Sequence, residues 1–395
     1  MTDDFKRRLQ DYKNGSLTDE ERAALEQQLE QMEIYQSYLD DMLDGEEHQR
    51  NAESIRVSPK EINLHKREAS LLRKGKWRAR IGTALTLIGL YIGVTVLASI
   101  GTSLYYSTGE PDRRSIYLDV VESAIAVTNP NITVHLSSGT RADFSMKVTS
   151  KMTTRVGDEV LEVGDFSGTF LFNWIRLYDF KWSDSEASRS TLFQFPGTKE
   201  LSSDKEWRRL AKLPEGTVAE AYVSYDRLYK TDEFLQQFRD KQLEPLWFAV
   251  DNGVHGAGND YDGVVVNPIG FPSRPLWHLD DGQITKHETS KGLLGSMGSK
   301  VTVYPTIEPY GSGQLRDENF IKTLRILEEH KSITDRLTFG VDMTKSLAYV
   351  EKSGVNIYGA VVTGPTKEIL KLKNDPAVSS IRVGKVTLWN WDHES

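Results

Sequence analysis

The stretch from Gly253 to Gly263, GVHGAGNDYDG, contains the most suggestive set of chemistry-bearing residues in the chain. Its glycines free the backbone to wrap around a ligand. His255, Asp260 and Asp262 supply the nitrogen and oxygen donors that a cation would need. The spacing of the acids does not fit the EF-hand calcium loop. A flexible surface turn is therefore the favoured interpretation, with a cation or ligand loop as the alternative.

Other patterns for catalysis or metal binding are absent from the sequence. His255, His278 and His287 lie near one another without metal-ligand spacing, so we expect ordinary surface histidines. The 395 residues include no cysteine, which removes thiol nucleophiles and thiolate metal sites. There is no nucleophile elbow, phosphate-binding glycine loop or zinc-protease helix. The sequence thus predicts no enzyme, no catalytic or metal site and no cofactor.

One stretch, from Ile81 to Tyr106, organises the rest of the chain. It reads IGTALTLIGLYIGVTVLASIGTSLYY and contains no charged residue. A helix rises about 1.5 Å per residue, so this stretch can cross a hydrocarbon core of roughly 30 Å with some tilt. The alternative is a buried helix of a soluble domain. Such a helix normally shows a polar face, and this stretch shows none. We therefore expect a membrane span.

The flanks of this stretch predict its orientation. The preceding segment is basic and includes Arg73, Lys74, Lys76, Arg78 and Arg80. The following segment starts with Tyr105 and Tyr106 and continues to Glu110 and Asp112. Basic flanks stay in the cytoplasm, and aromatic side chains favour the interfaces. We expect an uncleaved single-pass protein with a cytoplasmic N-terminus. A large outer domain without disulfides fits a bacterial cell membrane.

The charge pattern of the cytoplasmic segment changes along its length. Residues 1–55 contain fifteen acids and six bases, whereas residues 56–80 contain nine bases and two acids. The basic block suits anionic headgroups near the membrane. The acidic block is a poor nucleic-acid binder and suits a basic protein partner, with a merely solvated surface as the alternative.

The same segment is predicted to be all helical. Phe5, Leu9 and Tyr12 have helical spacing, and Thr18 with Glu21 forms a capping box for the next helix. A second capping box starts a helix that runs toward the membrane, with Pro59 at its first position. A segment this small buries only a modest core, so we expect a partner to complete its apolar stripes. A compact bundle satisfied internally is the alternative.

Part of this segment resembles the anti-sigma domain of bacterial membrane-bound anti-sigma factors. The resemblance covers roughly residues 5–45 and lies in Tyr12-x-x-Gly15-x-Leu17-Thr18-x-Glu20-Glu21 and Glu26-x-Gln28-Leu29-x-x-Met32-x-x-Tyr35. Zinc-binding members have a histidine and two cysteines where this chain has Gln28, Met32 and Tyr35, which do not make a zinc site. The resemblance therefore implies a metal-free module that binds a sigma factor.

The outer segment begins with a stretch that reads as strands, from Ser115 to about Asp179. Ile132, Val134 and Leu136 alternate with polar residues, and the run from Thr169 to Trp174 alternates as well. These patterns predict an antiparallel sheet near the membrane. The polar stretch 183–203 indicates a loop or a boundary.

Residues 204–395 contain a candidate internal repeat. One unit is predicted to run helix 206–213, strand 219–225, a helix around Phe234 and strand 247–250. The second is predicted to run helix 344–351, strand 356–363, helix 366–372 and a strand near 380–386, with a helix at 319–329 between the units. Chance similarity of ordinary α/β units is the alternative.

This segment also resembles the C-terminal sigma-factor-regulator domain of Gram-positive anti-sigma proteins. The matching parts are Gly270-Phe271-Pro272 and the run from Ser346 to Lys367. The resemblance implies a sensor domain and assigns no ligand-binding residue.

Together these features predict a multidomain protein: an all-α cytoplasmic module (1–80), one transmembrane helix (81–106), a membrane-proximal β-rich domain (107–203) and an α/β sensor domain (204–395). We expect an anti-sigma factor that sequesters an extracytoplasmic-function sigma factor and releases it on an extracytoplasmic signal, as in a stress response. The sigma factor would contact an apolar set: Leu9, Tyr12, Leu25, Leu29, Met32, Tyr35 and Leu39. A second membrane protein or a cell-envelope ligand is a further candidate partner. The alternative is a membrane-anchored surface enzyme or cell-wall-binding protein.

Overall fold

The structure is a computed structural model. It describes residues 59–183, 193–198, 202–254, 263–292, 295–338 and 340–388, and nine separate positions between Asp11 and Leu39. For residues 59–75, 284–292 and 295–301 it describes the course of the backbone only. The chain forms two compact units, Met1–Gly89 and Leu90–Ser395.

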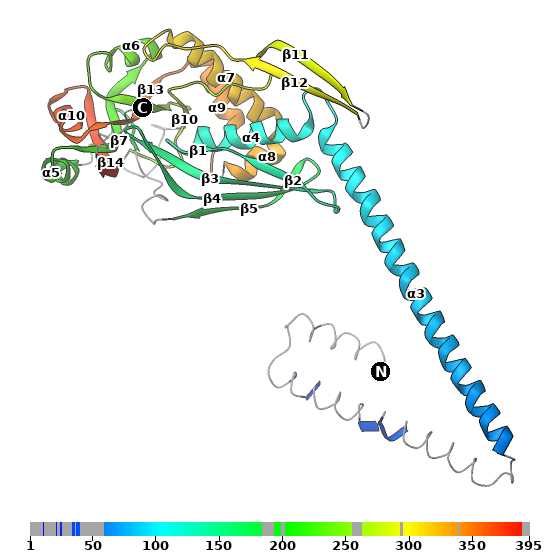
Figure 1. The fold of residues 1–395 in the computed structure, drawn as a ribbon. Helices are drawn as coiled ribbons and strands as arrows, with labels where there is room; N and C mark the ends of the chain where they lie inside the picture. The colour runs from blue at the N-terminus through cyan, green and yellow to red at the C-terminus, as the bar shows by residue number, and fades with distance from the viewer. Residues whose placement is uncertain are drawn as a thin grey trace. The chain divides into compact units, whose positions relative to one another are not determined.

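A single long helix, α3 (Pro59–Ser107), contains the predicted span (Figure 1). Its apolar part is Lys76–Ser107, and the most apolar window of 18 residues in it has a mean hydropathy of 2.0 and no buried residue. Leu87, Tyr91 and Leu97, for example, are 61%, 73% and 70% exposed. Large apolar side chains left open on all sides of a helix suit lipid and not the core of a soluble domain. The structure thus confirms one helix that is long and apolar enough to cross a membrane.

Threonines inside the span keep their polar groups satisfied within the helix. Thr83 Oγ1 donates to the carbonyl oxygen of Ala79 at 3.0 Å. Thr95 Oγ1 donates to the carbonyl oxygen of Tyr91 at 2.8 Å. Hydrocarbon offers no hydrogen-bond partner, so these internal bonds make the hydroxyls compatible with a bilayer.

The segment directly after the span is a helix, α4 (Arg113–Thr128). The prediction of strands from Ser115 onward was wrong for this segment. Asp112 is the N-cap, and its carboxylate accepts a hydrogen bond from the Ser115 backbone N–H at 3.0 Å. The helix is buried on most sides between Val120 and Val127. A short, fully buried apolar run does not show by its periodicity whether it is a helix or a strand.

The predicted antiparallel sheet near the span is confirmed. Its strands are β1 (Thr133–Val134), β2 (Ser137–Thr140), β3 (Ser145–Val156), β4 (Glu159–Leu171) and β5 (Trp174–Trp182). The order is β1-β3-β4-β5, and β2 also pairs with β3. The alternation predicted from Thr169 to Trp174 extends across two strands, because β4 ends at Leu171 and a turn leads into β5. Strand β5 is the edge strand, and Ile175 is its one fully buried residue.

A second antiparallel sheet is built from the C-terminal half of the chain. Its strands are β7 (Thr217–Tyr229), β8 (Glu244–Val250), β10 (Ile269–Pro272), β13 (Ile357–Pro365) and β14 (Val378–Leu388), in the order β10-β8-β13-β7-β14. Two smaller pairs accompany it: β6 (Phe193–Gln194) with β9 (Val264–Val265), and β11 (Gln283–Gly292) with β12 (Gly295–Val303).

The helices of this half pack in two groups. They are α5 (Asp204–Lys212), α6 (Thr231–Gln236), α7 (Gly313–Glu329), α8 (Lys331–Leu337), α9 (Met343–Ser353), α10 (Thr366–Lys371) and the 3-10 helix η1 (Leu372–Asn374). Helix α7 packs against α6 and α9, and α5 packs against α10. Helix α4 packs against α7, α8 and β10, so the helix that follows the span lies inside this arrangement.

The order of elements matches the expected repeat, as α5-β7-α6-β8 and α9-β13-α10-β14. The central strands β7 and β13 are neighbours, β8 lies beside β13, and β14 lies beside β7. Each β-α-β unit therefore encloses a strand of the other unit, which is the doubled split β-α-β arrangement. Superposition of the two halves stays a prediction.

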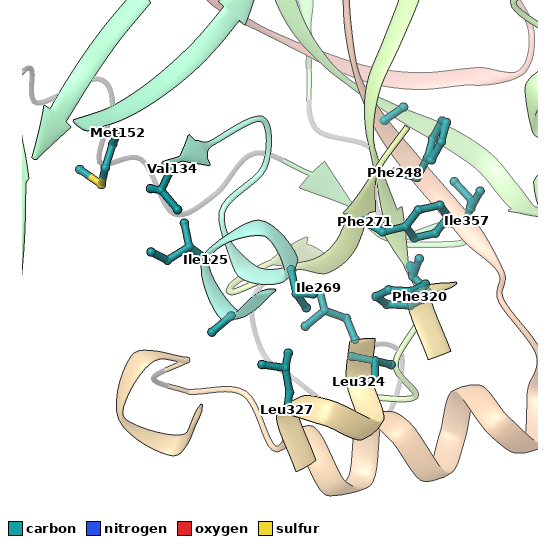
Figure 2. Close-up of a cluster of buried hydrophobic side chains, with 14 of the residues drawn as sticks. Ile125, Val134, Met152, Phe248, Ile269, Phe271, Phe320, Leu324, Leu327 and Ile357 are labelled. Atoms are coloured by element: carbon teal, nitrogen blue, oxygen red, sulfur yellow. The ribbon is translucent and has the colours of Figure 1, made fainter. Parts of the chain in front are cut away.

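One hydrophobic core connects the two sheets (Figure 2). Met152 of β3 and Ile125 of α4 belong to the same cluster as Phe248 of β8, Phe271 of β10 and Phe320 of α7. All five side chains are at least 96% buried. The membrane-proximal sheet and the C-terminal sheet therefore stabilise each other.

Polar contacts reinforce this core. Trp247 Nε1 donates to the Ala126 carbonyl oxygen at 2.8 Å, which fastens β8 to α4. Glu220 of β7 is 3% exposed and accepts a hydrogen bond from Asn131 Nδ2 at 2.6 Å, which joins β7 to the segment before β1. Burial raises the pKa of the Glu220 carboxyl group, although its donors, of which Asn131 is the strongest, act in the opposite direction.

Candidate functional site

The predicted partner-binding residues lie in the N-terminal unit, and the structure describes three of the seven. Leu25 is fully buried, whereas Tyr35 and Leu39 are 64% and 39% exposed. The other four lie outside the described residues: Leu9, Tyr12, Leu29 and Met32. Tyr35 and Leu39 are thus available for contact with a partner, and Leu25 is already covered within the chain.

Two further exposed apolar side chains lie on the same helical segment. Ile34 and Tyr38 are 65% and 59% exposed. Residues four apart on a helix lie on the same side, so Ile34 lies beside Tyr38, and Tyr35 lies beside Leu39. We call these four side chains the 34–39 face. Sequence reasoning omitted Ile34 and Tyr38 from the binding set, although their four-residue spacing was a visible signal.

Three positions of this unit correspond to metal ligands in the zinc-binding proteins that it resembles. Tyr35 presents an exposed phenol, and Gln28 and Met32 lie outside the described residues. In the part of the chain that the structure describes, no three His, Asp or Glu side chains come together so as to hold a metal ion. The side-chain types at the three positions do not match a structural zinc site, which uses thiolate and imidazole ligands.

The glycine-rich stretch and the histidines of the second unit, Leu90–Ser395, are placed only in part. His255 and the acids that follow it lie outside the described residues, as does the side chain of His287. His278 is 1% exposed, so the expectation of a surface histidine was wrong for this residue. It is buried because both of its ring nitrogens have oxygen partners from distant parts of the chain.

The His278 cluster comprises Asp119, Glu122, His278 and Thr323. His278 Nδ1 lies 3.0 Å from Asp119 Oδ1, and His278 Nε2 lies 2.8 Å from Thr323 Oγ1. Asp119 belongs to α4 and Thr323 to α7, so the histidine connects the helix after the span to the main helix of the C-terminal half. Its partners are 159 and 45 residues away in sequence, which is why no local pattern revealed them.

Glu122 lies one helical turn after Asp119 on α4. Burial raises the pKa of the Glu122 carboxyl group, and the Asp119 carboxylate raises it further, while His135 and His278 act in the opposite direction. A buried histidine that is bonded to side chains on two helices holds those helices together.

A second arrangement surrounds the point where the span ends. The membrane-exit cluster comprises Thr102, Tyr105, Tyr106, Phe144 and Phe172. Tyr106 is 1% exposed, and its hydroxyl donates to the carbonyl oxygens of Phe144 and Phe172 at 3.2 and 3.3 Å. The Phe144 backbone N–H donates to Thr102 Oγ1 at 3.1 Å. The turns after β2 and β4 are therefore bonded directly to the last two turns of α3.

Both clusters fix the position of a helix. The membrane-exit cluster attaches the end of α3 to the first sheet, and the His278 cluster attaches α4 to α7. Only a short turn separates the two helices. The end of α3 and the whole of α4 are therefore bonded to the rest of the second unit, Leu90–Ser395.

Comparisons with known proteins fit such a role. Residues 69–161 match the family described as sigma factor regulator N-terminal, and residues 210–385 match the family described as sigma factor regulator C-terminal. The matches extend from the basic flank of the span to β14. The chain belongs to the sigma factor regulator family. The family resemblance read from Gly270-Phe271-Pro272 and the run 346–367 is confirmed, because both lie inside the C-terminal match.

This sigma factor regulator also has a relative along its whole length. The protein named "Probable anti-sigma-M factor YhdL" from Bacillus subtilis (strain 168) is 28% identical over 401 residues, which cover 99% of this chain and 100% of the relative. No solved structure matches the chain.

Replacing His278 tests whether its cluster stabilises the outer unit. His278→Ala removes the ring nitrogen that faces the partly buried Asp119 carboxylate and leaves the Thr323 hydroxyl with its bond to the Asn319 carbonyl oxygen alone. We therefore expect a loss of about 2 kcal/mol in the free energy of unfolding. Thermal unfolding of the detergent-solubilised chain, followed by near-UV circular dichroism, measures it. His135→Ala removes an exposed histidine from the same unit and is the control. Equal melting temperatures for the two variants would contradict the structural role.

Proposed function

We propose that this chain is a single-pass membrane anti-sigma factor that sequesters an extracytoplasmic-function sigma factor and thereby represses transcription from its promoters. The observation that carries the proposal is the full-length relation to an anti-sigma-M factor, together with the matches to both parts of the sigma factor regulator family. One exposed apolar helix between two units supplies the membrane anchor that such a regulator needs. The family implies a regulatory, non-enzymatic role.

The orientation in the membrane follows from the basic flank. Lys76, Arg78 and Arg80 are exposed on α3 immediately before the apolar stretch, and positive residues favour the cytoplasmic side. We infer that residues 1–80 form a cytoplasmic helical module, that residues 81–106 cross the membrane and that the remainder lies outside. Within that remainder we propose a membrane-proximal β-rich domain of residues 107–203 and an α/β sensor domain of residues 204–395. We also propose that the second of these contains an αβαβ repeat.

We infer that the sigma factor contacts the apolar side of the N-terminal helices. The 34–39 face leaves four large apolar side chains exposed on a small unit, and such patches mark interaction sites. Leu9, Tyr12, Leu29 and Met32 complete the proposed set, with Leu25 as its buried support. Acidic neighbours such as Asp19, Glu20 and Glu33 would adjust the rate of encounter with a basic partner surface. No metal is needed for this contact, because the residues at the ligand positions of zinc-binding relatives are not zinc ligands.

We infer that the outer unit controls release. A signal shifts a two-state equilibrium only if it binds the two states with different affinity. A second membrane protein or a cell-envelope ligand that prefers one packing of α4 against α7 would satisfy this requirement, because α4 follows the span directly.

Topology is tested with reporters fused at two places. Alkaline phosphatase fused after Leu388 should be active, because it folds only outside the cytoplasm, and the same enzyme inserted after residue 58 should be inactive. A β-galactosidase fusion at each site should give the opposite result. Active phosphatase at residue 58 would contradict the proposed orientation.

The binding face is tested by placing a charge on it. Leu39→Asp should weaken the affinity of residues 1–80 for the sigma factor by at least about 2 kcal/mol, or roughly thirtyfold. The reason is that an apolar side chain that the sigma factor would cover in the complex is replaced by a charge. Ser37→Asp adds the same charge to the same exposed helical segment, three residues after Ile34, without removing an apolar side chain, and should leave the affinity close to that of the unaltered fragment. Isothermal titration gives both affinities, and circular dichroism verifies the helical content.

In cells, Leu39→Asp in the full chain should raise transcription from the promoters of the sigma factor, and Ser37→Asp should not. Equal affinities and equal promoter activities for the two variants would show that the 34–39 face is not the binding surface.

A further inference from the structure

We propose that the outer unit contacts the lipid bilayer directly, by inserting Phe144 and Phe172 into the outer leaflet beside the span. The two phenylalanines lie in the turns that precede β3 and β5. The proposal rests on α3 crossing the membrane. It adds to the proposed function a second, peripheral membrane contact that fixes the outer unit against the lipid surface.

Depth along α3 is the first argument. Gly101 lies six residues before the end of the helix at Ser107, which corresponds to about 9 Å of helical rise. The headgroup region on each side of a bilayer is roughly 5 to 7 Å thick. Phe144 Cε1 lies 3.4 Å from the position that a Cβ on Gly101 would occupy. A ring held against Gly101 is therefore at the level of the lipid interface.

Exposure is the second argument. The rings of Phe144 and Phe172 are stacked, with centroids 5.6 Å apart. Phe144 is nevertheless 39% exposed and Phe172 is 42% exposed. Trp174, at the start of β5, is 40% exposed beside them, and Leu177 is 64% exposed further along the strand. An aromatic group of this size at the end of a span is typical of membrane interfaces, where rings lie at the level of the headgroups.

The backbone at these turns is the third argument. Phe144 and Phe172 have φ angles of +59° and +55°, which bulky residues rarely adopt. Hydrogen bonds from the Tyr106 hydroxyl to both carbonyl oxygens, and from the Phe144 N–H to Thr102, hold the two turns in this conformation. The span itself therefore sets where the two rings lie, and it keeps them beside the helix in the bilayer.

Charge near the turns favours lipid as the occupant. Arg141 and Arg176 are exposed within four residues of the phenylalanines, and Arg336 lies over the Trp174 ring at 4.4 Å. These three bases outnumber Asp143, the exposed acid directly before Phe144. Basic side chains next to aromatic ones suit anionic headgroups. The contact also continues the surface of the span, whose own side chains already face lipid.

The chain has no cysteine, so single cysteines can be labelled without altering any native residue beyond the chosen site. We would attach a nitroxide to Phe144→Cys and Phe172→Cys in the full-length protein, reconstituted in vesicles of phosphatidylcholine and phosphatidylglycerol. Power saturation then compares relaxation by oxygen, which concentrates in lipid, with relaxation by a water-soluble nickel chelate. Trp174→Cys is a third position at the same end of the sheet, for use if either phenylalanine variant fails to fold.

Two matched positions calibrate the measurement. Val160→Cys lies on β4 of the same sheet, at the end away from these turns, and Val160 is 66% exposed. Leu97→Cys lies in the span, and Leu97 is 70% exposed. We expect oxygen to relax the labels at positions 97, 144 and 172 more strongly than nickel does, and the reverse at position 160.

Nickel accessibility at 144 and 172 equal to that at 160, with 97 in lipid, would overturn the proposal and leave the span intact. A label at 97 in water would instead overturn the membrane assignment and, with it, the proposed function. Shielding of 144 and 172 from both reagents would show coverage by protein and would also overturn the lipid contact.

Discussion

A lipid bilayer offers no water to backbone polar groups, so a single chain segment crosses it only as a helix. Helix α3 meets this constraint with an apolar surface that the rest of the chain does not cover, and with threonine hydroxyls that bond back to its own carbonyl oxygens. The remaining architecture follows from it. The chain divides into its two units within this helix, between Gly89 and Leu90.

The second unit is attached to the end of the span by side-chain contacts as well as by the covalent chain. Tyr106 bonds to two turns of the first sheet, and α4 begins within a few residues and is buried among α7, α8 and β10. His278 then joins α4 to α7 through Asp119 and Thr323. These contacts leave the second unit little freedom to move independently of the end of the span. If that unit senses a signal, as proposed, an altered packing of α4 would change the position or rotation of the span.

Elements whose signal is local could be predicted from the sequence. The apolar run 81–106, the start of α3 at Pro59 and the strands β7, β8, β13 and β14 follow from periodicity and capping residues, whereas β10 and α8 were not predicted. Helix α4 was mistaken for strands because its residues are buried on most sides, and a short buried run loses its periodicity.

Features that depend on distant partners could not be found in this way. His278 resembled a surface residue because its two partners are brought to it only by the fold. The same holds for Phe144 and Phe172, whose roles depend on a tyrosine 38 and 66 residues earlier. Of the proposed sigma-binding residues, Tyr35 and Leu39 are exposed, and Ile34 and Tyr38 extend the same face.

The central claim is that the N-terminal helices of this sigma factor regulator hold a sigma factor. The most direct measurement is purification of the tagged full-length chain from native membranes, with mass spectrometry of the proteins that it retains. A variant that lacks residues 1–58 but keeps α3 and the outer unit is the comparison. The account predicts that the full chain retains an extracytoplasmic-function sigma factor in near-equal amount and that the shortened chain retains none. Absence of a sigma factor from the full chain, or its equal retention by the shortened chain, would contradict it.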